Sequence, residues 1–143
     1  MKDLFVPYKQ ALILKELGFN ETCLTFYDLN KNIVKNDDWA HGIDMNSLPN
    51  SNWKFSCLAP LYQQVFKWFR DKHGLYVHIQ PEFYKQGINF CWQILWYEPK
   101  EKWTEYNVND GTWLYGDNGE FPAQEDAELA CIREMIKIVK EKI

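Results

Sequence analysis

The segment Ile88–Tyr97 constrains the fold most, because its side chains alternate strictly between two kinds. Large apolar residues recur at every second position: Ile88, Phe90, Trp92, Ile94 and Trp96. Successive side chains of a β-strand point to opposite faces, so this pattern predicts a strand with one strongly apolar face. A second layer of structure must cover that face.

Two amphipathic helices are predicted to form the second layer. The first runs from Ala59 to Gly74, with Pro60 near its first turn and an apolar stripe of Leu61, Val65, Trp68 and Phe69. The second runs from Gln124 to Lys142, with a stripe of Leu129, Ile132, Ile136 and Val139. Its acidic start and lysine-rich end complement the helix dipole. We expect both helices to pack on the apolar face.

The remaining strands are predicted around Ile88–Tyr97 as an antiparallel meander. Leu75–Gln80 alternates directly after Gly74, and Pro81–Gly87 is interpreted as the turn that follows it. Trp103–Val108 is the third predicted strand, and Thr112–Tyr115 is a short fourth one.

The first part of the chain is predicted to hold a helix, a strand and a long loop. Pro7–Leu17 has helical periodicity and ends before Gly18, and Thr22–Leu29 has strand composition with Ile33-Val34 as a short partner. Lys35–Cys57 is polar and aperiodic, so we expect an extended loop. The sequence thus predicts one α+β domain, residues 1–143. In it, a two-layer meander of three to four strands packs against two long helices, with an N-terminal helix and strand added.

Charge and cysteine usage argue against several classes of protein. A net charge of −4 disfavours a general binder of nucleic acids or anionic membranes, which relies on Lys and Arg. The four cysteines are widely spaced without a CxxC motif, so buried free thiols are expected rather than a zinc or redox site. No apolar run approaches the length of a membrane span. We expect a cytoplasmic protein without a cofactor.

Three weak patterns are candidates for metal or catalytic chemistry. Asp28-x-Asn30-x-Asn32 matches the start of a calcium loop but lacks its later Gly and Glu, which disfavours a calcium site. Asp38, His41 and Asp44 gather oxygen and nitrogen ligands in one loop, although their spacing matches no established metal site. Cys91 and His78 are candidates for a thiol–imidazole pair, if the register makes them neighbours.

The sheet face opposite the apolar one is the candidate binding surface. The residues predicted there are polar or aromatic and suit base stacking or a protein contact: Tyr76, His78, Gln80, Gln93 and Tyr97. Solvent-facing residues of a one-sided sheet have the same composition. The helix, meander and helix order also echoes double-stranded-RNA-binding domains. The acidic start of the last helix, with Glu125, Asp126 and Glu128, would repel phosphates.

Three blocks of sequence resemble a group of small uncharacterised proteins encoded by phages, prophages and related mobile elements of gut bacteria. The blocks are FVPY with LKELGF near the start, APLYQQV with WFRDKH in the middle, and AELACI with IKIVK near the end. The resemblance implies a phage-related origin, and no activity or site residues come with it.

These observations favour a non-enzymatic interaction or accessory protein that binds a host or phage protein. A first alternative is a nucleic-acid-associated accessory protein that uses the aromatic sheet face. A second alternative is a small enzyme with a site near His78 and Cys91, or near Asp38, His41 and Asp44.

Overall fold

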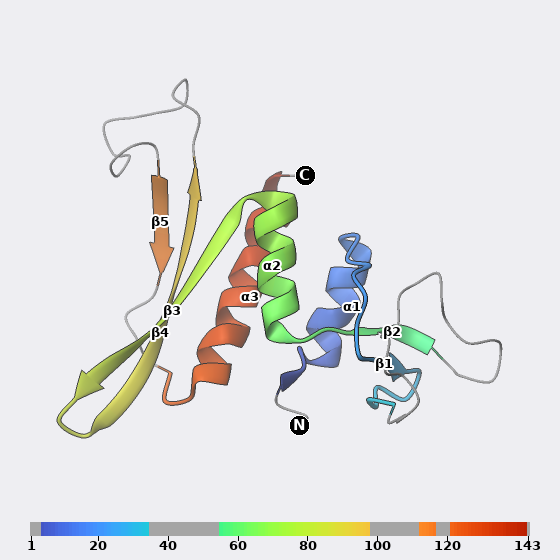
Figure 1. Ribbon diagram of the computed structural model, residues 1–143, viewed down its shortest axis with the longest axis horizontal. Coiled ribbons are helices and arrows are strands. Elements are labelled where there is room, and N and C mark those ends of the chain that lie inside the picture. The colour runs from blue at the N-terminus through green and yellow to red at the C-terminus, as the bar shows by residue number, and fades with distance from the viewer. Residues whose placement is uncertain (1–3, 35–54, 98–111, 117–120, 143) are drawn as a thin grey trace. The chain divides into compact units, whose positions relative to one another are not determined.

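The computed structural model describes residues 4–34, 55–97, 112–116 and 121–142. The chain divides into two compact units, Met1–Val65 and Phe66–Ile143, which are described in turn (Figure 1). The protein is α+β, with three helices and two antiparallel sheets in the described part of the chain. None of these helices is long and apolar enough to span a membrane.

Helix α1 (Tyr8–Glu16) opens the first unit and confirms the predicted helix over 7–17. Pro7 is its N-cap, and Gly18 follows it with a positive φ of 97°, a conformation that other residues adopt only with strain. Phe19 then donates a backbone hydrogen bond to Leu14 and returns to the core.

Strand β1 (Thr25–Asp28) pairs antiparallel with β2 (Phe55–Ala59). The predicted pairing with Ile33-Val34 is also present, as a bridge between Tyr27 and Ile33. The predicted loop over 35–57 is wrong at its end, where residues 55–57 belong to β2. Residues 35–54 lie outside the described part. Four successive residues of β2 are buried, and a strand buried on both faces has no alternation by which the sequence would reveal it.

Helix α2 (Tyr62–His73) begins later than predicted and runs from the first unit into the second. Ala59 ends β2 instead of starting the helix. The backbone N–H of Leu61 donates to Oε1 of Gln64 at 2.9 Å, and Nε2 of Gln64 donates to the Thr22 carbonyl at 2.7 Å. This reach of a glutamine back to the residue before the helix resembles half of a capping box, and it sets the helix start.

Strand β3 (Leu75–Tyr84) is four residues longer than the predicted strand, so the turn predicted over Pro81–Gly87 is confined to Lys85 and Gln86. The pairing with β4 (Gly87–Tyr97) runs without a break from Leu75 opposite Trp96 to Tyr84 opposite Gly87. Pro81 fits because its partner Phe90 exchanges backbone hydrogen bonds with Phe121 on its other side. The N–H that proline lacks would therefore point away from β4, at the sheet edge.

Strand β5 (Thr112–Gly116) pairs with β4, which gives the antiparallel order β3-β4-β5 and confirms the short strand predicted at 112–115. A Cβ on Gly116 would lie 2.7 Å from the Trp92 carbonyl oxygen, so glycine allows the close approach there. The strand predicted at Trp103–Val108 lies outside the described residues.

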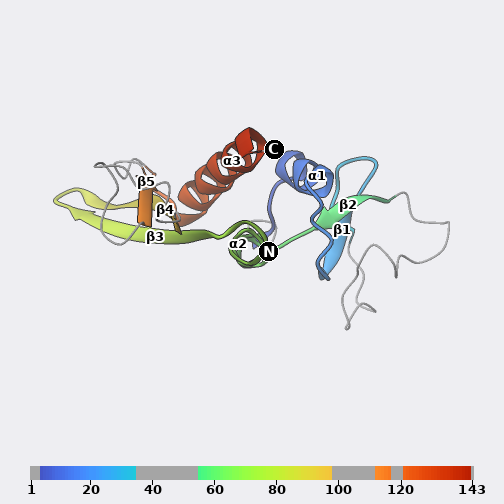
Figure 2. The same cartoon turned by 90° about the horizontal axis from the view of Figure 1, so that it is seen from above.

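Helix α3 (Gln124–Lys142) has the predicted bounds and packs against β3 and β4 (Figures 1 and 2). Its buried residues include the predicted Ile132, Ile136 and Val139. The prediction that two long helices cover the sheet is confirmed in part. Helix α3 covers the sheet, whereas α2 is short and contributes Trp68 and Phe69 to the buried residues.

Candidate functional site

The apolar face of the β3–β4 hairpin continues past the point where side chains are buried. Leu75 and Ile94, on the face that meets α3, are almost fully buried. Phe83 and Ile88 lie on the same face by strand alternation, yet they are 77% and 47% exposed. The prediction that Ile88 is a core residue is therefore wrong. Phe90 is half-buried, between the two extremes.

We call this end of the face the tip surface, which comprises the exposed Pro81, Phe83 and Ile88 and the half-buried Phe90. Figure 1 shows the end of the hairpin extending beyond the start of α3. The bridge between Phe90 and Phe121 is the last backbone pairing on this side of β4 within the described residues. An exposed apolar surface on a two-stranded projection is typical of a contact site for another molecule.

Tyr84, at the end of the hairpin, lies on the opposite face of β3 from Phe83 and is also exposed. Its hydroxyl donates a 2.6 Å hydrogen bond to the Glu82 carboxylate, and this bond raises the pKa of the Tyr84 phenol. The hydrogen bond fixes an aromatic ring and a carboxylate side by side, on the face opposite Phe83.

The predicted binding face is present along β3 and β4. Tyr76, His78 and Gln80 are exposed on one face of β3, and Gln93 lies opposite His78 and is half-buried. The side chain of Tyr97 lies outside the described set. The structure thus brings four of the five predicted residues onto one face, and their role as a binding site stays a prediction.

Cys91 and His78 share this face but are not directly opposite each other. Cys91 faces Gln80, and His78 faces Gln93, so the two are diagonal neighbours. The Cys91 thiol is buried and donates to the Gln80 carbonyl oxygen at 3.5 Å. Diagonal neighbours are typically about 7–8 Å apart, too far for the direct proton transfer that a thiol–imidazole pair needs.

The acidic pattern at Asp28 is explained by a turn. The Asp28 carboxylate accepts hydrogen bonds from the backbone N–H groups of Asn30 and Asn32, at 2.8 and 3.0 Å. Lys31 between them has a φ of 65°. A carboxylate that caps its own turn in this way closes the chain reversal without a cation.

The other metal candidates, Asp38, His41 and Asp44, lie outside the described residues. Within the part that is described, no group of three or more His, Cys, Asp or Glu side chains is placed to hold a metal ion.

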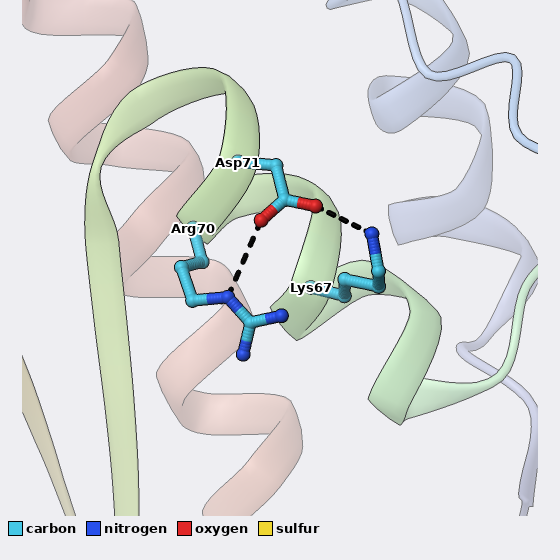
Figure 3. A network of polar contacts seen from close by, with 3 residues as sticks. All are labelled: Lys67, Arg70 and Asp71. Atoms are coloured by element: carbon cyan, nitrogen blue, oxygen red, sulfur yellow. Dashed lines mark hydrogen bonds and ion pairs between the residues drawn. The ribbon is translucent and has the colours of Figure 1, made fainter.

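The outer face of α2 carries a small exposed charge network (Figure 3). Asp71 lies 2.5 Å from Nζ of Lys67 and 3.3 Å from Nε of Arg70. The hydrogen bond from Lys67 lowers the pKa of the Asp71 carboxyl, with Arg70 adding to the effect. Exposed pairs of this kind contribute little stability, and Asp71 offsets one of the two positive charges that it contacts.

All four cysteines are buried and none forms a disulfide, as predicted. Burial raises the pKa of Cys23 to about 12 and that of Cys57 to about 11. Because the thiolate is the reactive form, these two side chains are poor nucleophiles at neutral pH. They serve packing in the first unit rather than chemistry.

Sequence reasoning missed the tip surface because it placed a turn at Pro81–Gly87. The available signal was the alternation of Leu75, Val77 and Ile79, which continues through Pro81 to Phe83.

Comparison with protein-family models, with curated proteins and with solved structures finds no match.

Proposed function

We propose that this protein is a non-enzymatic interaction protein of a phage or mobile element, which binds a host or phage protein through the tip surface. The exposure of Phe83 and Ile88, paired on the apolar face of the hairpin, carries the proposal. Burying both side chains in a complex would contribute roughly 2–4 kcal/mol, enough to make them the centre of a contact. A cytoplasmic location suits buried cysteines that form no disulfide.

The proposal is tested by affinity capture from a lysate of a bacterium that carries the gene. Three baits are compared: the natural protein, Phe83→Ser with Ile88→Ser, and Leu24→Ser with Leu29→Ser. The third bait is the matched control, because Leu24 and Leu29 are exposed leucines of the first unit.

A partner protein should be recovered with the natural bait and the control, and lost with the tip variant. Recovery of the same partner with the tip variant would reject the tip surface as the binding site. Thermal unfolding of each bait checks that the substitutions leave the fold intact.

A second function is favoured by the exposed Tyr76 on the opposite face, beside His78 and Gln80. In this alternative, the protein is a nucleic-acid-associated accessory factor whose aromatic side chain stacks on a base. A mobility-shift titration with single- and double-stranded probes at low salt tests it. Binding that Tyr76→Ala abolishes would support the alternative, and no shift would remove it.

A small enzyme is the third proposal. A site near His78 and Cys91 would need a substrate or a water molecule to connect the two diagonal side chains.

A further inference from the structure

We propose that the outer edge of β3 at the tip surface takes up an extended segment of the partner protein, which adds to the sheet as a further antiparallel strand. This inference rests on the proposed function. It adds the backbone conformation of the partner to the location of the site. It follows from the direction in which the backbone groups of β3 point.

The backbone of Pro81 points away from β4. Its partner Phe90 exchanges two backbone hydrogen bonds with Phe121 on the other side of β4, at 2.7 and 3.4 Å. Pro81 and Phe90 are therefore a non-hydrogen-bonded pair of the antiparallel ladder. Hydrogen-bonded and non-hydrogen-bonded pairs alternate along a ladder, and this one runs without a break. The N–H and C=O groups of Ile79 and Phe83 therefore also point outward, to the edge of the sheet.

The outward backbone groups are available to a partner. In the described part of the chain, β3 is an outer strand of its sheet, and no backbone hydrogen bond to another described element involves Ile79, Pro81 or Phe83. Figures 1 and 2 both show the end of the hairpin extending away from α2, the helix that precedes β3. Because proline has no N–H, the edge offers the N–H groups of Ile79 and Phe83 and the carbonyl groups of all three residues.

An added strand is the structure that pairs with these groups. Outward N–H and C=O groups at every second residue of a strand edge are a template for another strand. A helix keeps its backbone groups in internal hydrogen bonds, so it would leave the edge unpaired. The antiparallel direction continues the pairing of β3, β4 and β5. In that direction, the partner residues that bond to the edge share a face with Phe83, so we expect apolar side chains at those positions.

Pro81 disfavours a second copy as the source of the added strand. In an antiparallel contact between two such edges, each copy would bring its own Pro81, so two N–H donors would be missing from a short ladder. Proline at an edge is a common defence against this edge-to-edge pairing. A partner strand without proline meets one missing donor only, and it can still donate to the Pro81 carbonyl group. The occupant is therefore a segment of another protein.

The test measures the binding of labelled peptides to the full chain by fluorescence anisotropy. The first probe is a peptide of about eight residues in which Val alternates with Thr, two residues that favour strands. Two further probes carry N-methyl groups on the backbone, one at every Val and the other at every Thr. Methylation at Val removes the donors that face the edge and should weaken binding at least roughly tenfold. Methylation at Thr alters N–H groups that face solvent and should leave binding unchanged.

Variants of the protein locate the binding at the edge. Pro81→Thr supplies the missing N–H and should tighten binding of the unmodified peptide roughly fivefold. Ile79→Pro removes an outward N–H that β4 does not use, and should weaken binding roughly fivefold. Its matched control is Ile79→Ala, which shortens the same half-buried side chain but keeps the N–H. Leu24→Ser with Leu29→Ser, in the first unit, should bind like the natural protein.

The inference is overturned if the unmodified peptide does not bind, if the two methylated peptides bind equally, or if Pro81→Thr leaves the affinity unchanged. Dimerisation of the natural protein in sedimentation velocity, without peptide binding, would assign the edge to a second copy instead. After any of these results, capture of a cellular partner that still depends on Phe83 and Ile88 would leave the proposed function standing, with a partner that does not add a strand. Capture that is independent of both residues would reject the proposed function itself.

Discussion

Phe83 lies directly opposite Ile88 across the hairpin, and both remain exposed on the face that buries Ile94 six residues further along the strand. The three residues have the same position in the alternation of the strands. What differs is the cover, because α3 packs on one end of this face and begins short of the other.

Phe83→Ser should leave stability within about 1 kcal/mol of the natural protein, because the side chain leaves little buried contact behind. Ile94→Ala should cost about 2–5 kcal/mol, since it opens a cavity in a fully buried position. Urea unfolding of both variants measures the difference. An equal loss of stability in the two variants would mean that the Phe83 side chain is packed against other residues in solution.

Trp68→Ala should lower the free energy of unfolding by about 3–5 kcal/mol, so that much of the native structure is lost. The indole is buried in α2 and stacks edge-on with Phe69 at a centroid distance of 5.0 Å. Lys67→Ala, on the exposed face of the same helix, is the control and should lose less than about 1 kcal/mol. A Trp68→Ala protein that melts at the natural temperature contradicts the packing described.

Glu128→Gln should stabilise the protein near neutral pH. Burial raises the pKa of Glu128, Gln124 partly opposes this through a 3.1 Å hydrogen bond, and Glu125 adds to the increase. The folded state therefore favours the protonated acid. The stability that this provides is present below the unfolded pKa of about 4.3 and is lost as the pH rises through the higher folded pKa.

The advantage of Glu128→Gln over the natural protein should therefore grow as the pH rises from about 4 to 7. Urea titrations across this range measure it. Glu141→Gln, an exposed position on the same helix, should show no such trend. A pH-independent difference for Glu128→Gln would argue that the carboxyl is solvated.

Cys23 and Cys57 should resist alkylation in the folded protein at about pH 8, and react fully in urea. Their pKa values, raised by burial to about 12 and 11, keep both thiols protonated. The associated stability is present below the ordinary thiol pKa and is lost as the pH rises through these higher values, so the fold should weaken in strong alkali. Mass spectrometry after timed iodoacetamide treatment measures the reactivity. Rapid native labelling of either residue would contradict its burial.

Local sequence rules were sufficient for the elements that have a clear period and clear ends. The bounds of α3 follow from its stripe and its charge order, and α1 follows from Pro7 and Gly18. Strand β4 follows from the alternation of its large apolar residues. The rules failed at β2, which lacks alternation, and at Pro81, which was interpreted as a turn residue although an edge strand accepts it.

The predicted site residues show the same limit. Tyr76, His78 and Gln80 were placed on one face because alternation alone fixes that. The pairing of Cys91 with Gln80 instead of His78 depends on the register, and the register follows from the length of β3 and its turn.

The sequence by itself determined which side chains share a face, because the backbone period of a helix or strand is local. It also determined the start and end of α1 and α3, and the apolar character of the β3 face from Leu75 to Ile79. Only the tertiary structure decided which part of that face is buried. Burial depends on where α3 begins relative to the strands, a long-range relationship that the alternation of Ile88–Tyr97 does not contain. For this reason Ile94 is a core residue and Ile88, with the same pattern, is exposed at the proposed binding site.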